Sequence, residues 1–194
     1  MNIDKALAEL SRLYADMDAA YAKRAGAIGL TCQGCTDTCC RTHFHHHTVL
    51  ERVHLEAGLG GLAGDLRADL IERARTYQAE VRRAQADGRV VRAACPLLKD
   101  DRCVLYDHRP MICRLHGVPW VLHQGRLAGR VQPGCDRAMQ RLANAPPPPP
   151  LDRTVFYAKL AELERVARRL TAQKNPVKFT VAELIRQFAR KESR

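Results

Sequence analysis

The sequence CQGCTDTCC, residues 32–40, holds four of the eight cysteines of this 194-residue chain. Two residues separate Cys32 from Cys35, a spacing that lets the turn between two cysteines fold around one metal ion. Three residues then lead to the adjacent pair Cys39 and Cys40. Four thiols this close together are poorly explained as filling of a hydrophobic core, so the segment predicts a metal-binding loop.

The adjacent pair poses a geometric problem, because neighbouring side chains in a chain usually diverge. We therefore do not expect Cys39 and Cys40 both to bind one tetrahedral ion as terminal ligands. Either one thiol binds a second metal, or one bridges two metals, or one is a reactive thiol. The sequence leaves these three interpretations open.

A second group contains the remaining cysteines: Cys95, Cys103, Cys113 and Cys135. Pro110 suits the first turn of a helix, which would place Cys113 near the N-terminal end of that helix. Backbone N–H groups and Arg114 would favour a thiolate there. Cys135 follows a Pro-Gly turn and precedes an expected short helix. All eight cysteines are therefore candidate metal ligands.

Histidines follow the first cysteine group closely: His43, His45, His46 and His47, with His54 one helix further on. Imidazole binds zinc and iron, so additional ligands are one interpretation and a solvated polar loop is the other. Zinc or iron as individual ions is the first choice of metal, and an iron–sulfur cluster is the alternative. The ferredoxin spacing C-x2-C-x2-C-x3-C-P is absent from the sequence.

The cysteines are interpreted in this way because we expect a cytoplasmic protein. The N-terminal residues lack the apolar segment of a secretory signal, and no stretch approaches the roughly 20 apolar residues of a membrane span. Thiols stay reduced in the cytoplasm, so eight cysteines indicate metal or redox chemistry rather than disulfides. The formal net charge of +11 is compatible with a nucleic acid, an acidic partner or solubility alone.

Apolar periodicity predicts a mostly α-helical fold with a small β-hairpin, forming a cysteine-rich metal-binding domain. The expected helices are one from residue 3 that glycines at 26 and 29 end, those over 49–57, 65–87 and 156–170, and a last one from Thr180. Capping boxes open two of them, Thr48 with Glu51 and Thr180 with Glu183. A brief strand is expected at residues 90–91, and the hairpin at 118–131, turning near residues 124–125.

Five consecutive prolines, Pro146–Pro150, predict a stiff extended spacer. The expected organisation is a cysteine-cluster domain over residues 1–145, a linker over 146–150 and a basic helical extension over 151–194. Eleven basic and five acidic residues give that extension a charge of +6.

The two cysteine groups in this order resemble the CxxCxxCC family, whose members are described as zinc- or iron-chelating domains. The matching residues are Cys32, Cys35, Cys39, Cys40, Cys95-Pro96-Leu97, Cys103, Tyr106, Arg109-Pro110, Cys113-Arg114, Gly117 and Pro133-Gly134-Cys135. The gap between Cys35 and Cys39 is one residue longer than the family name implies. The histidine cluster and the basic extension lie outside the family pattern. The resemblance implies metal binding, without a particular reaction.

Three functions are weighed from the sequence. The first is a metal-binding protein that chelates zinc or iron, and the second is an iron–sulfur or metal-dependent redox enzyme. No nucleotide-binding, nucleophile-elbow or zinc-protease motif supports the enzyme. The third and least favoured is a zinc-supported nucleic-acid-binding protein that uses basic residues of the extension: Arg165, Arg168, Arg169, Lys174 and Lys178. No protein partner and no membrane association are predicted.

Overall fold

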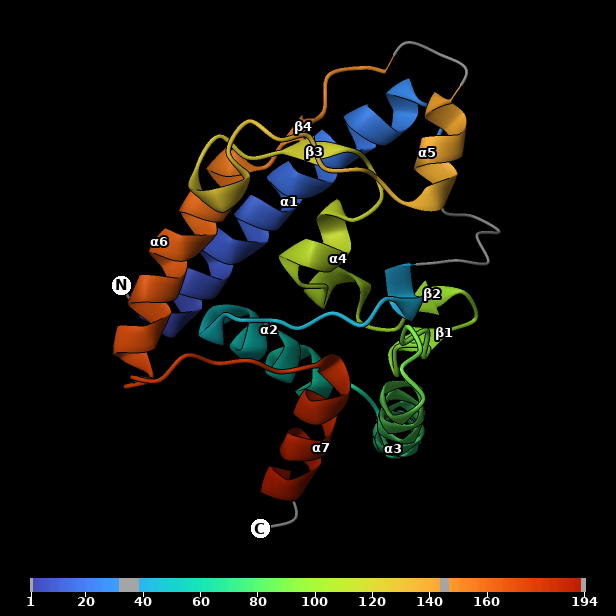
Figure 1. The fold of residues 1–194 in the computed structure, drawn as a ribbon. Helices are drawn as coiled ribbons and strands as arrows, with labels where there is room; N and C mark the ends of the chain where they lie inside the picture. Colours follow the sequence, from blue (N-terminus) through green and yellow to red (C-terminus); the bar gives the residue numbers. More distant parts are fainter. Residues whose placement is uncertain (1, 32–38, 144–146, 193–194) are drawn as a thin grey trace. The chain divides into compact units, whose positions relative to one another are not determined.

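The protein is mostly helical, as the sequence predicts. The computed structural model describes residues 2–31, 39–143 and 147–192 (Figure 1). In these residues it forms seven α-helices, which make up 61% of the structure, together with two small two-stranded sheets. The chain divides into two compact units, and each combines segments that are far apart in the sequence. Unit 1 comprises residues 1–35 and 111–172, and unit 2 comprises residues 36–110 and 173–194.

Unit 1 is built on the long helix α1 (Ile3–Ala27), which packs against α4 (Met111–Leu115) and α6 (Thr154–Leu170). In Figure 1 the N-terminal helix and α6 run side by side. The unit also contains η3 (Gly125–Leu127) and α5 (Asp136–Leu142). The apolar stripe of α1 is buried, and its inward residues are Ala6, Leu10, Leu13, Tyr14 and Met17. Burial of this stripe stabilises unit 1.

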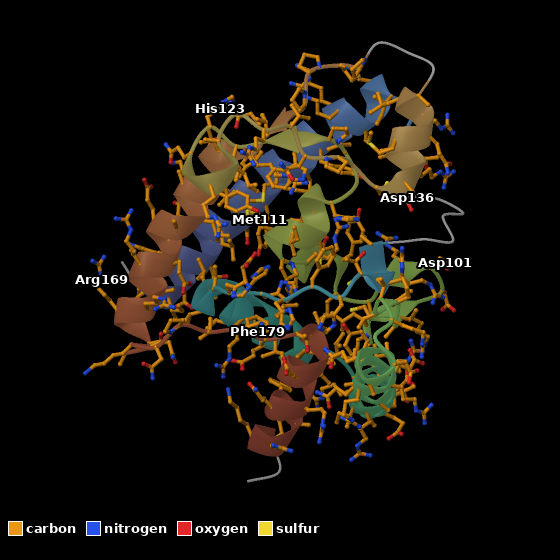
Figure 2. All side chains as sticks on the ribbon, viewed as in Figure 1. Asp101, Met111, His123, Asp136, Arg169 and Phe179 are labelled. Carbon is orange, nitrogen blue, oxygen red and sulfur yellow. The ribbon has the colours of Figure 1, made fainter. Side chains whose placement is uncertain are left out.

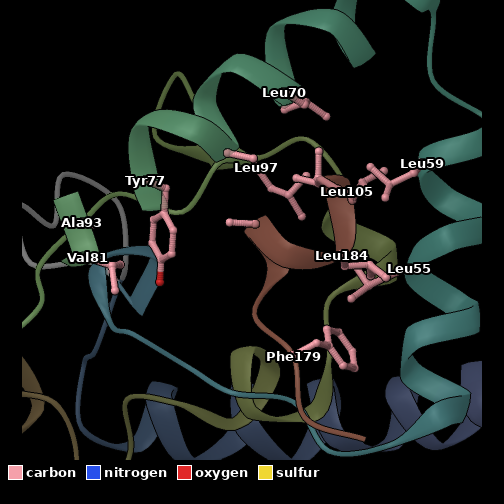
Figure 3. Close-up of a cluster of buried hydrophobic side chains, with 13 residues drawn as sticks. Leu55, Leu59, Leu70, Tyr77, Val81, Ala93, Leu97, Leu105, Phe179 and Leu184 are labelled. Atoms are coloured by element: carbon pink, nitrogen blue, oxygen red, sulfur yellow. The ribbon is translucent and has the colours of Figure 1, made fainter. Parts of the chain in front are cut away.

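Unit 2 contains α2 (Val49–Gly60), α3 (Gly64–Ala86) and α7 (Val181–Glu192), with α7 packed against both other helices. Its core is one cluster of buried side chains: Leu55, Leu59, Leu70, Ala74, Tyr77, Val81, Ala93, Leu97, Leu105, Phe179, Ala182, Leu184 and Ile185 (Figure 3). The cluster joins α2, α3 and α7 with the segment that carries Cys95 and Cys103.

Both predicted capping boxes are present. The Thr48 hydroxyl accepts a hydrogen bond from the Glu51 backbone N–H at 3.3 Å and donates one to the Glu51 carboxylate at 2.7 Å. Thr180 accepts from the Glu183 N–H at 3.2 Å, and the Thr180 N–H donates to the Glu183 carboxylate at 2.7 Å. These contacts satisfy backbone N–H groups that the first turns of α2 and α7 would otherwise leave without partners.

The hairpin predicted at residues 118–131 is wrong in form. β3 (Trp120–Val121) pairs in parallel with β4 (Leu151–Asp152), which directly follows the prolines. The segment after β3 does return, but only through the isolated bridge between Trp120 and Gln132 and through η3. The strand predicted at residues 90–91 is absent from the described structure. Pairing across about 30 residues leaves no local pattern from which it could be predicted.

The antiparallel hairpin lies instead in unit 2, where β1 (Leu98–Lys99) pairs with β2 (Arg102–Cys103). Its two turn residues, Asp100 and Asp101, have φ values of 49° and 59°, the left-handed conformation of a two-residue primed turn. Asp101 lies in this turn, at the tip of the hairpin (Figure 2). Asp tolerates the conformation, but a pair of Asp residues is a weaker sequence signal than Asn-Gly.

The two units divide the chain differently from the predicted domains, because α6 belongs to unit 1 and α7 to unit 2. As a statement about domains that fold independently, the boundaries at residues 145 and 151 stay a prediction. Prolines 148, 149 and 150 contact a hollow of unit 1 that Val118 and Pro119 also line. In the described part of the chain, none of the helices combines the length and apolar character needed to cross a membrane.

Candidate metal centre

The hairpin β1–β2 brings Cys103 back beside the segment of Cys95. Leu98 pairs with Cys103, and the Val104 N–H donates a hydrogen bond to the Leu97 carbonyl at 2.8 Å. Both cysteines pack against the core cluster of unit 2 and are partly buried. The left-handed turn at the tip of this hairpin therefore positions the second pair of thiols.

The first cysteine group reaches the same place through the backbone. Cys39 and Cys40 begin the short 3-10 helix η1 (Cys39–Arg41), and the Cys95 N–H donates a hydrogen bond to the Cys40 carbonyl at 2.7 Å. The Thr42 N–H donates to the Cys39 carbonyl at 3.1 Å, which closes the turn. We call Cys39, Cys40, Cys95 and Cys103 the thiol cluster. In unit 2 the structure thus joins residues from both cysteine groups.

Burial and mutual repulsion make the thiolates of this cluster costly. Burial raises the pKa of Cys95 to about 12, and the thiolates of Cys103 and Cys39 add to the increase. A hydrogen bond to the Cys40 side chain, followed by burial, raises the pKa of Cys39 well above its usual range, while the Arg109 guanidinium acts in the opposite direction. A bound cation would reverse this balance, since it stabilises every thiolate that contacts it.

The described residues do not form a complete metal site by themselves. No three His, Cys, Asp or Glu side chains within residues 2–31, 39–143 and 147–192 are arranged to hold one metal ion. The predicted ligands Cys32 and Cys35 lie outside the described residues. The six cysteines that are described are thiols and not disulfides. Soft thiolate donors from two segments match the chemistry of zinc and iron sites.

Cys113 and Cys135 belong to unit 1. Cys113 lies in α4, as Pro110 predicts, and Cys135 is the N-cap residue of α5. The Cys135 N–H donates to the Gly117 carbonyl at 2.8 Å. A Cβ on Gly134 would lie only 2.3 Å from that carbonyl oxygen, which explains why a glycine precedes this cysteine.

Arg114 has a different role from the predicted one. Its guanidinium pairs with Asp18 at 2.5 Å and lies 4.0 Å above the ring of Tyr14, so it connects α4 to α1. The side chain is 5% exposed. A buried arginine in such a pair stabilises the packing of unit 1, because its fork is satisfied by a carboxylate and an aromatic face. Its predicted effect on the Cys113 thiolate stays a prediction.

The predicted histidine cluster divides into distinct environments. His43 is hydrogen-bonded through Nδ1 to the Tyr77 hydroxyl at 2.7 Å, and its ring contacts that of His45 at 4.7 Å. His46 is buried against Phe179 and exchanges two backbone hydrogen bonds with it, at 2.8 and 3.1 Å. His47 is exposed. A structural role for His46 is thus on the page, and ligation by the others stays untested.

Sequence reasoning missed Tyr77 as a neighbour of the thiol cluster. Its position on the inward stripe of α3 indicates core packing, and its ring does belong to the core cluster. Its hydroxyl, however, points out of that cluster (Figure 3) and bonds to His43, three residues beyond Cys40. Burial, followed by the charges of Cys95 and Glu183, raises the pKa of Tyr77 to about 12. Tyrosine needs a partner for its hydroxyl when buried, and that requirement is the signal that was available.

The basic residues of the predicted extension are partly engaged within the protein. Arg168 pairs with Glu164 at 2.8 Å, and Arg165 donates to the Ala161 carbonyl at 3.4 Å. Arg169, near the C-terminal end of α6, is exposed (Figure 2). Lys174 and Lys178 are exposed as well. Binding of a nucleic acid by these residues stays a prediction.

The helical scaffold and the two thiol groups define a mostly helical, cysteine-rich domain of the metal-chelating class. Residues 31–124 match the model of the family CxxCxxCC, described as "Putative zinc- or iron-chelating domain". This segment of the chain therefore carries the CxxCxxCC domain, which confirms the resemblance seen in the sequence. The matched segment contains the thiol cluster and Cys113, and ends before Cys135. No curated protein and no solved structure gives a significant match to the chain.

Proposed function

We propose that this protein chelates zinc or iron through cysteine thiolates of both groups. The proposed ligand set is Cys32, Cys35, Cys39, Cys40, Cys95, Cys103, Cys113 and Cys135. The observation that carries the proposal is the hydrogen bond from the Cys95 N–H to the Cys40 carbonyl, because it joins the two groups within unit 2. We place this chemistry in the reducing cytoplasm, where thiols remain available to a metal.

The electrostatics of the thiol cluster support the same function. Three of its thiols raise one another's pKa or are raised by burial, so the ionised cluster is unfavourable without a positive charge. A divalent metal supplies that charge and displaces the thiol protons when it binds. The incomplete set of described ligands is expected under this proposal, since Cys32 and Cys35 precede Cys39 in the sequence.

The test is anaerobic purification under reducing conditions, followed by elemental analysis and a visible absorption spectrum. We expect zinc or iron bound in stoichiometric amount to the wild-type protein and a several-fold loss of metal in the variant Cys95→Ser. The matched control is Ala93→Ser, which places a serine at a buried position of the same segment without removing a thiol. Wild-type protein without metal, or a Cys95→Ser variant with the wild-type content, would contradict the proposal.

The same spectrum decides between ions and a cluster. A colourless protein containing zinc, or iron without acid-labile sulfide, supports individual ions. A brown protein containing iron and acid-labile sulfide supports the iron–sulfur alternative and, with it, a redox enzyme.

A further inference from the structure

The side chains of Cys39 and Cys40 converge, contrary to the expectation that neighbouring thiols diverge. A hydrogen bond connects the two side chains, and both are partly buried. The cause is the 3-10 helix η1, whose tight turn begins at these two residues. Adjacent thiols that face each other form a vicinal dithiol, and this geometry was open but unassigned from the sequence.

The backbone around the pair is anchored on both sides. The Cys39 carbonyl accepts a hydrogen bond from the Thr42 N–H at 3.1 Å, and the Cys40 carbonyl accepts one from the Cys95 N–H at 2.7 Å. These two contacts hold the peptide groups of the pair while leaving both sulfur atoms without a role in the backbone network. The sulfurs can therefore change their bonding without breaking the two anchoring contacts.

We propose that Cys39 and Cys40 are a redox modification site, at which a peroxide converts the vicinal dithiol to a disulfide and thereby releases the bound metal. The inference rests on the proposed function, since it names a means of regulating the same site. It is specific to this pair, because no other cysteines of the chain are adjacent in the sequence.

The reaction is balanced with hydrogen peroxide as the oxidant. One sulfur attacks a peroxide oxygen, the O–O bond breaks, and a sulfenic acid and one water result. The second sulfur then attacks the sulfenic sulfur, the S–O bond breaks, and the oxygen leaves as a second water. Two thiols lose two protons and two electrons, and one peroxide is reduced to two waters. A disulfide sulfur carries no negative charge, so two thiolate ligands are lost at once.

A strained disulfide between neighbours is also readily reduced. Closing this bond makes a small ring that includes the peptide group between the two residues, and strained disulfides have more oxidising potentials than relaxed ones. A dithiol reductant should therefore restore both thiols and the capacity to bind metal. Reversibility distinguishes this site from oxidative damage, which proceeds to sulfinic and sulfonic acids.

The sequence provides a direct assay. Cleavage before Asp37 and after Arg41 releases the peptide DTCCR, which contains these two cysteines and no others. Full-length protein purified under reducing conditions is treated with hydrogen peroxide, alkylated to block remaining thiols, digested without reductant and examined by mass spectrometry. Metal content is measured on the same samples before and after treatment, and again after dithiothreitol.

We expect DTCCR to change from a doubly alkylated peptide to an unalkylated one that is two hydrogen masses lighter than the dithiol, with parallel loss of most of the metal. Recovery of DTCCR still doubly alkylated, further oxidised or linked to another peptide would overturn the inference, as would retention of metal by the disulfide form. If the reduced protein holds no metal, the proposed function fails, while the state of DTCCR still decides whether the dithiol closes.

Variants provide the matched control. Cys39→Ser and Cys40→Ser each remove the vicinal partner, so peroxide should no longer produce a disulfide within the peptide. The remaining cysteine should instead be recovered alkylated or as an over-oxidised acid. An unchanged rate of peroxide-driven metal loss in both variants would contradict a role for this pair.

Discussion

Acidification should destabilise the protein through His46. The side chain is 3% exposed and packs against Phe179, with ring centroids 5.4 Å apart. Burial, reinforced by the neighbouring His47 and His45, lowers the pKa of His46 to about 4, compared with 6.5 for an ordinary histidine. The folded protein thus keeps this imidazole neutral at a pH where the unfolded chain already binds a proton.

The direction of the effect follows from proton linkage. Between about pH 6.5 and pH 4 the unfolded chain binds more protons at this site than the folded protein, so stability rises with pH across that window. The full contribution is present above pH 6.5 and is lost as the pH falls toward 4. A pKa difference of about 2.5, at 1.36 kcal/mol for each pH unit, corresponds to a loss of about 3 kcal/mol.

The deciding assay is a proton NMR titration of the histidine ring signals, with the His46 signal assigned by its absence in the variant His46→Gln. Urea unfolding at several pH values then gives the difference in unfolding free energy between wild type and variant. That difference should shrink as the pH falls through the window, because the titration of all other groups is common to both proteins. The control is His47→Gln, an exposed neighbour. A His46 pKa of 6 or above, or a pH-independent difference, would refute the reasoning.

Two substitutions test the packing of each unit. Gly58→Ala should lower the unfolding free energy by about 1–3 kcal/mol in urea titrations, because the added Cβ would lie 2.3 Å from Cδ2 of His108. Gly60→Ala in the same helix, where the nearest listed neighbour is 3.8 Å away, should cost nothing, and equal effects of the two would contradict this explanation. Arg153→Met should destabilise unit 1 by about 1–3 kcal/mol, since the guanidinium donates to the Leu115 carbonyl. The same variant should shift the fluorescence of Trp120, the one tryptophan of the chain, over whose ring the guanidinium lies at 4.4 Å; unchanged emission and stability would show that the contact is absent in solution.

The helices could be predicted because their signals are local. A three- and four-residue apolar period selects the buried face of α1, and a Thr with a Glu three residues later marks the start of α2 and of α7. Each of these signals lies within a few residues of the element that it predicts. The helix that follows Pro110 and the one that follows Cys135 were predicted for the same reason.

The sheets could not be predicted with the same success. The hairpin β1–β2 depends on left-handed Asp100 and Asp101, a pair that favours this turn only weakly. The β3–β4 pairing depends on Arg153, whose side chain is 2% exposed although arginine normally indicates a surface position. A buried arginine over an aromatic ring has no sequence signature, because the partner is distant in the chain.

The candidate site shows the same division. The sequence identified the eight cysteines, and the family match over residues 31–124 agrees with the order of the two groups. It could not show that the Cys95 N–H bonds to the Cys40 carbonyl, or that Tyr77 lies against His43. Its expectation that Cys39 and Cys40 diverge failed, because η1 turns both side chains toward each other.

The division of unit 2 between residues 36–110 and 173–194 has a consequence for biosynthesis. On the ribosome the cysteine-bearing segment emerges well before α7, whose side chains complete its core. During that interval the nascent thiols are more accessible to solvent than in the finished protein. Delivery of an ion is therefore easiest while translation is still under way, and arrival of the last helix then closes the hydrophobic layer beneath it.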